Sequence, residues 1–234
     1  MFLFIIILGV VMLVGSLIYY VIANHMTIDF KSFIKKGFIK NDNDFGLYCY
    51  TGKQGKGKTY TSINFLINYI VNNPDTQIVT NIHSFKTFKN IVYIDDIDKL
   101  IDYCIENYEN QKIIIFFDEI FTILEKKTAI NKKILSFISQ LRKRKIIFIT
   151  TAQEWAEVNI TFRRYVRFQI DCNMFNIPII NRAFLFYSIN DGDGIKWDEQ
   201  QQEFVAPRVS CYFGKAKQSV INEYDTFETI STNK

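Results

Sequence analysis

The residues with the clearest chemical potential lie in one glycine- and lysine-rich segment, Gly52-Lys53-Gln54-Gly55-Lys56-Gly57-Lys58-Thr59. It fits the pattern G-x-x-x-x-G-K-[ST], in which backbone N–H groups cradle phosphate oxygens and the glycines allow their close approach. In this pattern Lys58 would reach the β- and γ-phosphates of a nucleotide, and the Thr59 hydroxyl would bind Mg²⁺. We expect ATP to be held by Gly52, Gln54, Gly55, Lys56, Gly57, Lys58, Thr59 and Tyr60.

The segments on both sides of this phosphate loop have the patterns of a strand and a helix. Residues 46–51 are short, apolar and aromatic, as a buried strand would be. After the loop, Ile63, Leu66 and Ile70 recur at helical spacing until Asn73-Pro74 interrupts the pattern. A loop in this position brings phosphate oxygens to the positive helix N-terminus. A surface turn rich in glycine and lysine is the alternative, and this context makes it the weaker interpretation.

A second chemical feature is a pair of carboxylates that follows the apolar run Ile113–Phe117. Such a run suits a central parallel strand covered on both faces, and open α/β sheets bind ligands at the carboxyl ends of their strands. The pattern resembles a Walker B strand. In that interpretation Asp118 holds Mg²⁺ and Glu119 polarises the water that attacks the γ-phosphate. An apolar strand ending in Asp-Glu is common by itself, and the phosphate loop before it makes it a candidate partner.

Three further side chains are candidates for catalysis. Gln153 lies just past another apolar segment, where its amide could sense the γ-phosphate, orient water or instead cap a helix. Arg163 and Arg164 precede a further strand, where an arginine can act as a finger toward a neighbouring subunit or form surface ion pairs. We expect the catalytic residues to be Lys58, Glu119, Gln153, Arg163 and Arg164, and the metal ligands to be Thr59 and Asp118.

The N-terminal segment has the properties of a membrane span. Residues 2–23 contain no charged residue and are long enough to cross a bilayer as a helix. No Lys or Arg precedes them and the segment is too long for a signal peptide, so we expect an uncleaved anchor. Lysines follow closely, which places the C-terminal bulk in the cytoplasm. A hydrophobic helix buried in the fold is the alternative. The lysines are Lys31, Lys35, Lys36 and Lys40.

Composition sets broader limits on the function. The chain has 234 residues and a formal net charge of +4, too small by itself to indicate nucleic-acid binding. The basic run Arg142-Lys143-Arg144-Lys145 fits either a solvated surface or a contact with nucleic acid or another subunit. The cysteines lack C-x-x-C spacing, so we expect reduced, mostly buried thiols. They are Cys49, Cys104, Cys172 and Cys211.

The order of elements predicts the fold class. Strands expected at 77–81, 90–94, 113–117 and 146–151 alternate with helices, which argues for a parallel sheet, and strands after residue 182 suggest an antiparallel extension. We therefore expect an α/β P-loop NTPase with a mostly parallel sheet flanked by helices, an antiparallel C-terminal extension and one N-terminal transmembrane helix. The expected divisions are an anchor (1–24), a basic juxtamembrane linker or interfacial helix (25–44), an ATPase domain (45–226) and a flexible tail (227–234).

With these residues placed, residues 45–170 resemble the zonula occludens toxin-like proteins, the filamentous phage assembly ATPases, within the wider FtsK and HerA group. The resemblance is carried by the phosphate loop, Thr80-Asn81-Ile82, Phe117-Asp118-Glu119 and the segment that ends in Thr151-Ala152-Gln153, with weaker support from Tyr224-Asp225-Thr226. One feature departs from the family pattern. The membrane span usually follows the ATPase domain in those proteins, and here it comes first.

The resemblance implies an oligomeric ATPase, with a hexameric ring as one arrangement, that uses ATP and Mg²⁺ to drive viral DNA through a membrane complex. Its implied partners are viral DNA or nucleoprotein, the membrane and other phage assembly or virion proteins. The expected location is the host inner membrane, crossed once, with the ATPase domain in the cytoplasm. Export and packaging of viral DNA both remain open, and so do conjugative or plasmid DNA transfer and a tethered ATP-binding switch or scaffold. A kinase that acts on small molecules is a weaker hypothesis.

Overall fold

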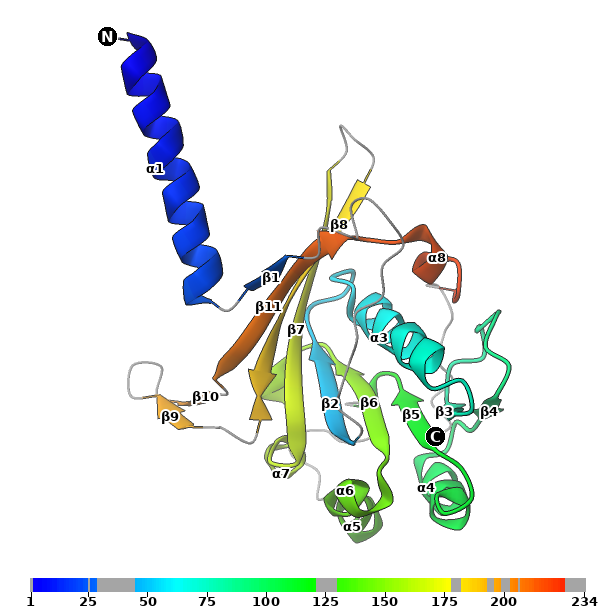
Figure 1. The fold of residues 1–234 in the computed structure, drawn as a ribbon. Helices are drawn as coiled ribbons and strands as arrows, with labels where there is room; N and C mark the ends of the chain where they lie inside the picture. The colour runs from blue at the N-terminus through cyan, green and yellow to red at the C-terminus, as the bar shows by residue number, and fades with distance from the viewer. Residues whose placement is uncertain are drawn as a thin grey trace.

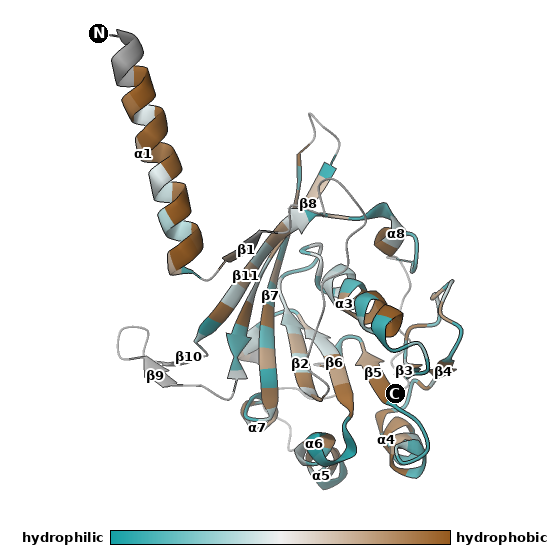
Figure 2. Ribbon diagram, in the orientation of Figure 1, coloured by the Kyte–Doolittle hydropathy of each residue, from teal (hydrophilic) through white to brown (hydrophobic). Residues whose placement is uncertain are grey.

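The structure, a computed structural model, describes residues 2–24, 26–28, 45–120, 130–177, 182–192, 196–198, 203–205 and 207–225. Helix α1 (Phe2–Ala23) matches the expected span, and its stretch Ile6–Ala23 has a mean hydropathy of 2.5. Figure 1 shows α1 projecting away from the rest of the chain, and Figure 2 shows it apolar along its length. By length and composition α1 can cross a bilayer.

The remainder of the described chain is organised by a nine-stranded sheet in the order β1-β11-β8-β7-β2-β6-β5-β3-β4. From β7 to β4 all neighbouring strands are parallel, whereas β8 is antiparallel to both β7 and β11. The strands are β1 (Met26–Ile28), β2 (Gly46–Thr51), β3 (Gln77–Thr80), β4 (Ile91–Tyr93), β5 (Ile113–Phe117), β6 (Ile147–Ala152), β7 (Val166–Ile177), β8 (Arg182–Asp191) and β11 (Arg208–Lys215). The expected class, a mostly parallel α/β P-loop fold with an antiparallel extension, is confirmed.

Helices cover the two faces of this sheet and bury two apolar clusters. Along β2, Leu47 and Cys49 point into one cluster and Tyr48 and Tyr50 into the other, because successive strand residues face opposite sides. The second cluster contains α3 (Lys58–Asn72) and α8 (Gln218–Ile221). The first contains side chains from α4 (Ile97–Asn107), α5 (Lys132–Ser139), α6 (Leu141–Arg144) and α7 (Ile160–Arg163). Smaller elements are the 3-10 helix η2 (Trp155–Glu157) and the pair β9 (Lys196–Asp198) and β10 (Glu203–Val205).

Several elements differ from the sequence expectation. The apolar spacing of Ile134, Ile138 and Leu141 predicts one helix that ends in the basic run, but the structure breaks it at Gln140 into α5 and α6. Lys145 ends α6 in a left-handed conformation with a φ of 54°. The pattern of residues 204–212 predicts one strand around Pro207, but the structure has two strands, β10 and β11, since proline cannot donate a ladder hydrogen bond. Residues 26–28, at the start of the expected linker, form β1 and join the sheet beside β11. The rest of that linker, 29–44, lies outside the described residues.

The C-terminal segment after β11 crosses back over α3 and holds the loop that follows β3 through hydrogen bonds. Glu223 is only 4% exposed, and its carboxylate accepts hydrogen bonds from the backbone N–H of Thr87 at 2.8 Å and from the Thr87 hydroxyl at 2.5 Å. At the other end of the segment, the N–H of Lys217 donates to the Tyr60 hydroxyl at 2.6 Å. Residues far apart in the sequence are thereby joined above the helix that begins in the phosphate loop.

We expect Glu223→Ala to lower the free energy of unfolding by about 1–3 kcal/mol, because Thr87 would lose the acceptor of two hydrogen bonds. For a chain of this size each kcal/mol lowers the melting temperature by about 2–4 °C. Thermal unfolding of the full chain in detergent measures the shift. Glu106→Ala is the matched control, since Glu106 is exposed and should change stability by no more than about 0.5 kcal/mol. Equal melting temperatures for the two variants would contradict this role of Glu223.

Candidate active site

The phosphate loop connects the carboxyl end of β2 to the first turn of α3, as expected. At two positions of the loop the backbone conformation and the close packing allow only glycine. Gly57, which precedes α3, has a φ of 82°, and a Cβ there would lie 2.9 Å from Cε of Met174. Gly52 has a φ of 144°, and a Cβ there would lie 2.7 Å from the carbonyl oxygen of Cys172. The loop therefore takes its shape against β7, a strand distant in the sequence.

Lys58 stands at the start of α3 with its ammonium held inside the loop. The side chain is only 9% exposed, and its Nζ donates to the backbone carbonyl of Lys53 at 3.4 Å. Helix α3 has fifteen residues, so its N-terminus carries the partial positive charge of a helix dipole. A buried ammonium beside a helix N-terminus and a glycine-rich backbone is an arrangement that binds phosphate groups.

Asp118 follows β5 and lies across from this loop. Its Oδ2 accepts a hydrogen bond from the Thr59 hydroxyl at 3.3 Å, and its Oδ1 accepts one from the Thr151 hydroxyl at 2.5 Å. The side-chain amide of Asn81 bonds the backbone of Asp118 in both directions, at 2.9 and 3.2 Å. Burial raises the pKa of the Asp118 carboxyl, and the hydrogen bond from Thr151 lowers it in part. Asp118 is thus fixed in position by the ends of β3 and β6 and by the first turn of α3.

Glu119 has an unusual backbone conformation beside this aspartate. Its φ of 55° lies in the left-handed region, which is disfavoured for a residue with a side chain. The N–H of Glu119 donates to the Thr151 hydroxyl at 2.9 Å, so the same hydroxyl serves both carboxylate residues. Such strain persists where the surroundings hold it, and it is frequent at functional sites. The conformation turns the chain immediately after β5, and the Glu119 side chain is half-exposed.

Among the other expected catalytic residues, only Gln153 is brought to the phosphate loop. Its backbone carbonyl accepts a hydrogen bond from the N–H of Gly52 at 3.3 Å, just beyond the pairing of Thr51 with Ala152. Arg163 ends α7 at the amino end of β7, where its guanidinium lies 5.7 Å from the Trp155 ring. Arg163 and Arg164 therefore lie at the opposite edge of the parallel sheet from the phosphate loop of their own chain (Figure 1).

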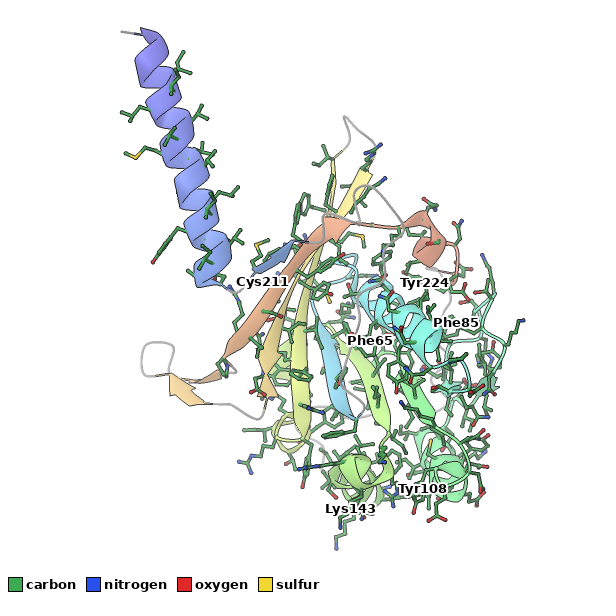
Figure 3. The ribbon with its side chains drawn as sticks, in the orientation of Figure 1. Phe65, Phe85, Tyr108, Lys143, Cys211 and Tyr224 are labelled. Atoms are coloured by element: carbon green, nitrogen blue, oxygen red, sulfur yellow. The ribbon has the colours of Figure 1, made fainter. Side chains whose placement is uncertain are left out.

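Two residues near the site were missed as candidates in the sequence. Thr151 was assigned to a strand and to the segment that carries the family resemblance, but not to the site. A hydroxyl at the carboxyl end of a strand next to the Asp-Glu strand could have indicated that role. Tyr224 appeared only in the weak family signal Tyr224-Asp225-Thr226, and it is the C-terminal segment that carries it to α3 (Figure 3). Burial raises the pKa of its phenol, and the nearby charge of Asp118 raises that pKa further. Tyr224 is 7% exposed and packs in the same cluster as Tyr60.

The assembled site has the components of a nucleotide-hydrolysing centre. A glycine-rich loop and a lysine at a helix N-terminus bind phosphate, and two carboxylates follow the adjoining strand β5. The oxygens of Asp118 and Thr59 are of the type that Mg²⁺ prefers, and in the described chain they bond each other. A donor set of one carboxylate and one hydroxyl beside a phosphate loop fits a Mg²⁺ ion that is completed by nucleotide and water oxygens.

Comparison with known proteins agrees with this geometry. The chain is similar in fold to the genome packaging NTPase B204 of Sulfolobus turreted icosahedral virus 2 in complex with ATP-gammaS, with a TM-score of 0.50 and 12% identity over 70% of this chain and 96% of B204. The same protein in complex with AMPPCP also gives 0.50, at 12% identity over 70% and 97%. The N-terminal domain of zonular occludens toxin from Neisseria meningitidis gives 0.49, at 19% identity over 77% and 98%.

No curated protein shows significant sequence similarity to the chain. A family model does match, over residues 48–175, which span the phosphate loop, the Asp-Glu pair and most of β7. This match covers more than half of the 234 residues and confirms the predicted resemblance at the level of the P-loop ATPase domain. The chain therefore belongs to the AAA family, the ATPases associated with various cellular activities.

Proposed function

We propose that this AAA-family protein is a membrane-anchored ATPase of phage assembly that couples ATP hydrolysis to export or packaging of viral DNA. The observation that carries the proposal is the Asp118–Glu119 pair, held by Thr151 opposite the phosphate loop. A protein that only binds a nucleotide has no need of a second carboxylate next to the metal ligand. The fold shared with a viral genome packaging NTPase favours DNA as the cargo.

In this proposal the loop residues bind ATP, and the two carboxylates have different roles, one in binding Mg²⁺ and the other in activating water. The N–H groups of the loop and Lys58 hold the β- and γ-phosphates. Tyr60 contributes through its backbone, because its side chain is buried in the core. Thr59 and Asp118 hold Mg²⁺, which neutralises charge on the phosphate oxygens when it is bound. Glu119 accepts a proton from the attacking water. The residues that bind ATP are Gly52, Gln54, Gly55, Lys56, Gly57, Lys58, Thr59 and Tyr60.

Gln153 and the two arginines complete the proposed catalytic set. The amide of Gln153 orients the attacking water or contacts the γ-phosphate, because its backbone is bonded to the start of the loop. Arg163 and Arg164 lie at the far edge of the sheet, so as fingers they would act on the site of a neighbouring copy. This arrangement requires a homo-oligomer, and a hexameric ring is the closed form that we propose.

The cargo and the membrane engage two different parts of the chain. The exposed side chains of Arg142, Lys143 and Lys145 offer a basic surface for a DNA backbone. Figure 3 shows Lys143 pointing away from the sheet, at the opposite end of the domain from Tyr224. Helix α1 anchors the chain once in the host inner membrane, with the ATPase domain in the cytoplasm beside other assembly or virion proteins.

The test is ATP hydrolysis by the full chain in lipid nanodiscs, with and without single-stranded or double-stranded DNA. We expect DNA to raise turnover severalfold, and the preferred strand type begins to separate export from packaging. Lys58→Ala is the negative control, which measures hydrolysis that does not come from this site. Turnover that never responds to DNA contradicts the motor, and ATP binding without turnover in an oligomeric sample favours a tethered switch or scaffold. Viral DNA and conjugative DNA give the same stimulation, so the neighbouring genes decide between those two pathways.

Thr151→Val tests whether the shared hydroxyl positions Asp118 and Glu119. We expect the Mg²⁺ concentration for half-maximal hydrolysis to rise, or the turnover number to fall, by about 10–100-fold, the usual effect of removing a group that orients a metal ligand. Thr150→Val is the matched control, since the buried Thr150 hydroxyl has no hydrogen-bond partner among the described residues. Thr151→Ser should restore activity. Equal effects at positions 150 and 151 would show that the hydroxyl of Thr151 has no special role.

A further inference from the structure

The antiparallel extension carries a group of aromatic rings on the face of the sheet that points away from α3. Met174, Leu185 and Tyr212 pack in the cluster with α3, so their strand neighbours point to the other face. There the rings of Phe175, Phe184 and Phe213 stack, with centroids 5.8 to 6.4 Å apart. We call these three residues the aromatic patch. Phe175 is 41% exposed, although it lies in a strand twelve residues long.

Basic side chains flank the aromatic patch. Arg182, the first residue of β8, is exposed, and Lys215, the last residue of β11, pairs across the strands with Phe184. Aromatic rings next to arginine and lysine are the composition of surfaces that rest at a membrane interface. The rings enter the boundary between headgroups and acyl chains, and the cations bind lipid phosphates.

The sheet also fixes where the aromatic patch lies relative to α1. Strand β1 follows α1 directly and pairs with β11, with Ile28 opposite Phe213 of the patch. Arg208, at the start of β11, donates through Nη1 to the side-chain oxygen of Asn24 at 3.1 Å, just after α1 ends. Figure 1 shows α1 and the far ends of β7 and β8 projecting from the same side of the domain. The membrane helix and the patch are thus joined by strand pairing.

We propose that the aromatic patch, with Arg182 and Lys215, docks on the lipid surface beside α1 and sets the orientation of the ATPase domain on the membrane. The inference rests on the proposed anchoring of α1. Continuity with α1 argues for lipid over a second copy of the chain, because the anchor holds the patch close to the bilayer at a high effective concentration. The start of β11 lies next to the end of α1, and the patch with its two cations lies toward the other end of β11, on the side of the domain toward which α1 projects (Figure 1).

This docking determines which edge of the sheet faces the membrane. Strand β7 is parallel to β2, so the carboxyl end of β7, where Phe175 lies, is at the same edge as the phosphate loop. The active site then opens toward the bilayer. The basic residues Arg142 and Lys143 of α6, and Arg164 after α7, face away from it toward the cytoplasm. DNA would therefore meet the domain first on the side opposite the lipid.

Spin labels on the full chain in vesicles of phosphatidylethanolamine and phosphatidylglycerol test this orientation. Labels are attached to Phe175→Cys, Tyr165→Cys and Met12→Cys. Phe175 and Tyr165 are both aromatic and both 41% exposed, one in the distal part of β7 and one just before its start, so they form a matched pair. Met12, 70% exposed near the middle of α1, reports whether the helix is in lipid. The collision ratio of oxygen to a water-soluble nickel complex measures each environment.

The native cysteines should not react with the labelling reagent, so the spin labels attach only at the introduced cysteines. All four are buried, and burial raises the pKa of Cys104 and Cys172 to about 12, so their unreactive thiol form predominates at neutral pH. Wild-type chain treated with the reagent gives the background. Ile177→Cys is a second reporter, on the same face of β7 as Phe175 and paired with Arg182. It keeps all three rings of the patch, so a change caused by losing Phe175 is detected.

We expect lipid-like ratios at positions 12, 175 and 177, and a severalfold lower, aqueous ratio at 165. A lipid-like ratio at 12 with aqueous ratios at 175 and 177 overturns the docking and leaves the anchor intact. An aqueous ratio at 12 overturns the anchor and the docking together. Labels at 175 and 177 that are shielded from both reagents and broadened by a second label indicate that another copy covers the patch, which also overturns the proposal.

Discussion

Replacing Glu119 by glutamine is expected to lower the turnover number for ATP by about 10²–10⁴-fold, the range for loss of a general base, while leaving ATP binding nearly unchanged. The reason is geometric. Glu119 follows Asp118 in a strained left-handed conformation, and Thr151 fixes its backbone, so the half-exposed side chain starts beside the aspartate that is proposed to hold Mg²⁺. Glutamine has the same shape but cannot accept the proton of the attacking water.

The measurement is single-turnover hydrolysis together with the affinity for ATP, each in the full chain. Glu154→Gln is the matched control, since it removes an exposed carboxylate just past Gln153 and should change neither quantity. Full turnover in Glu119→Gln would remove Glu119 from the catalytic role. A parallel loss of ATP affinity would mean that Glu119 acts in binding and not in the chemical step.

Lys58→Ala is expected to weaken ATP binding by about 10–100-fold, since a charge-assisted hydrogen bond contributes roughly 1.5–3 kcal/mol and each 1.4 kcal/mol is a factor of ten. Hydrolysis should fall to the background of the assay, because in the proposed mechanism Lys58 also stabilises the charge that develops on the γ-phosphate. In the folded chain its ammonium is almost fully buried and bonded to a loop carbonyl, so it is already in position before nucleotide arrives.

Lys53→Ala is the matched control for this prediction. It removes the same charge from the same loop, but the Lys53 side chain is exposed and only its backbone carbonyl contacts Lys58. Titration with ATP by calorimetry should give a clear difference between the two variants. Equal affinities for both would mean that general positive charge, and not the position of Lys58, binds the nucleotide. The two variants at positions 58 and 119 should also differ from each other, one losing binding and the other only turnover.

Much of the fold followed from local patterns. The parallel strands β2, β5 and β6 are apolar runs buried on both faces, and their sequences carry that requirement directly. Helix α1 has the predicted bounds because a long apolar stretch without charged residues by itself indicates a helix of that length. The break between α5 and α6 was not predictable, since the apolar spacing continues through Gln140 and only packing reveals the interruption.

The sequence by itself determined the chemistry: a phosphate loop, an Asp-Glu pair after a buried strand, and a separate apolar helix. These signals are local because each depends on a few neighbouring residues whose backbone or side chains act together. The tertiary structure decided which distant groups surround them. Thr151 and Asn81 fix Asp118, the C-terminal segment brings Tyr224 to α3, and β1 ties α1 to the edge of the sheet. Such contacts join residues far apart in the chain, and they exist only once strand order and register are set.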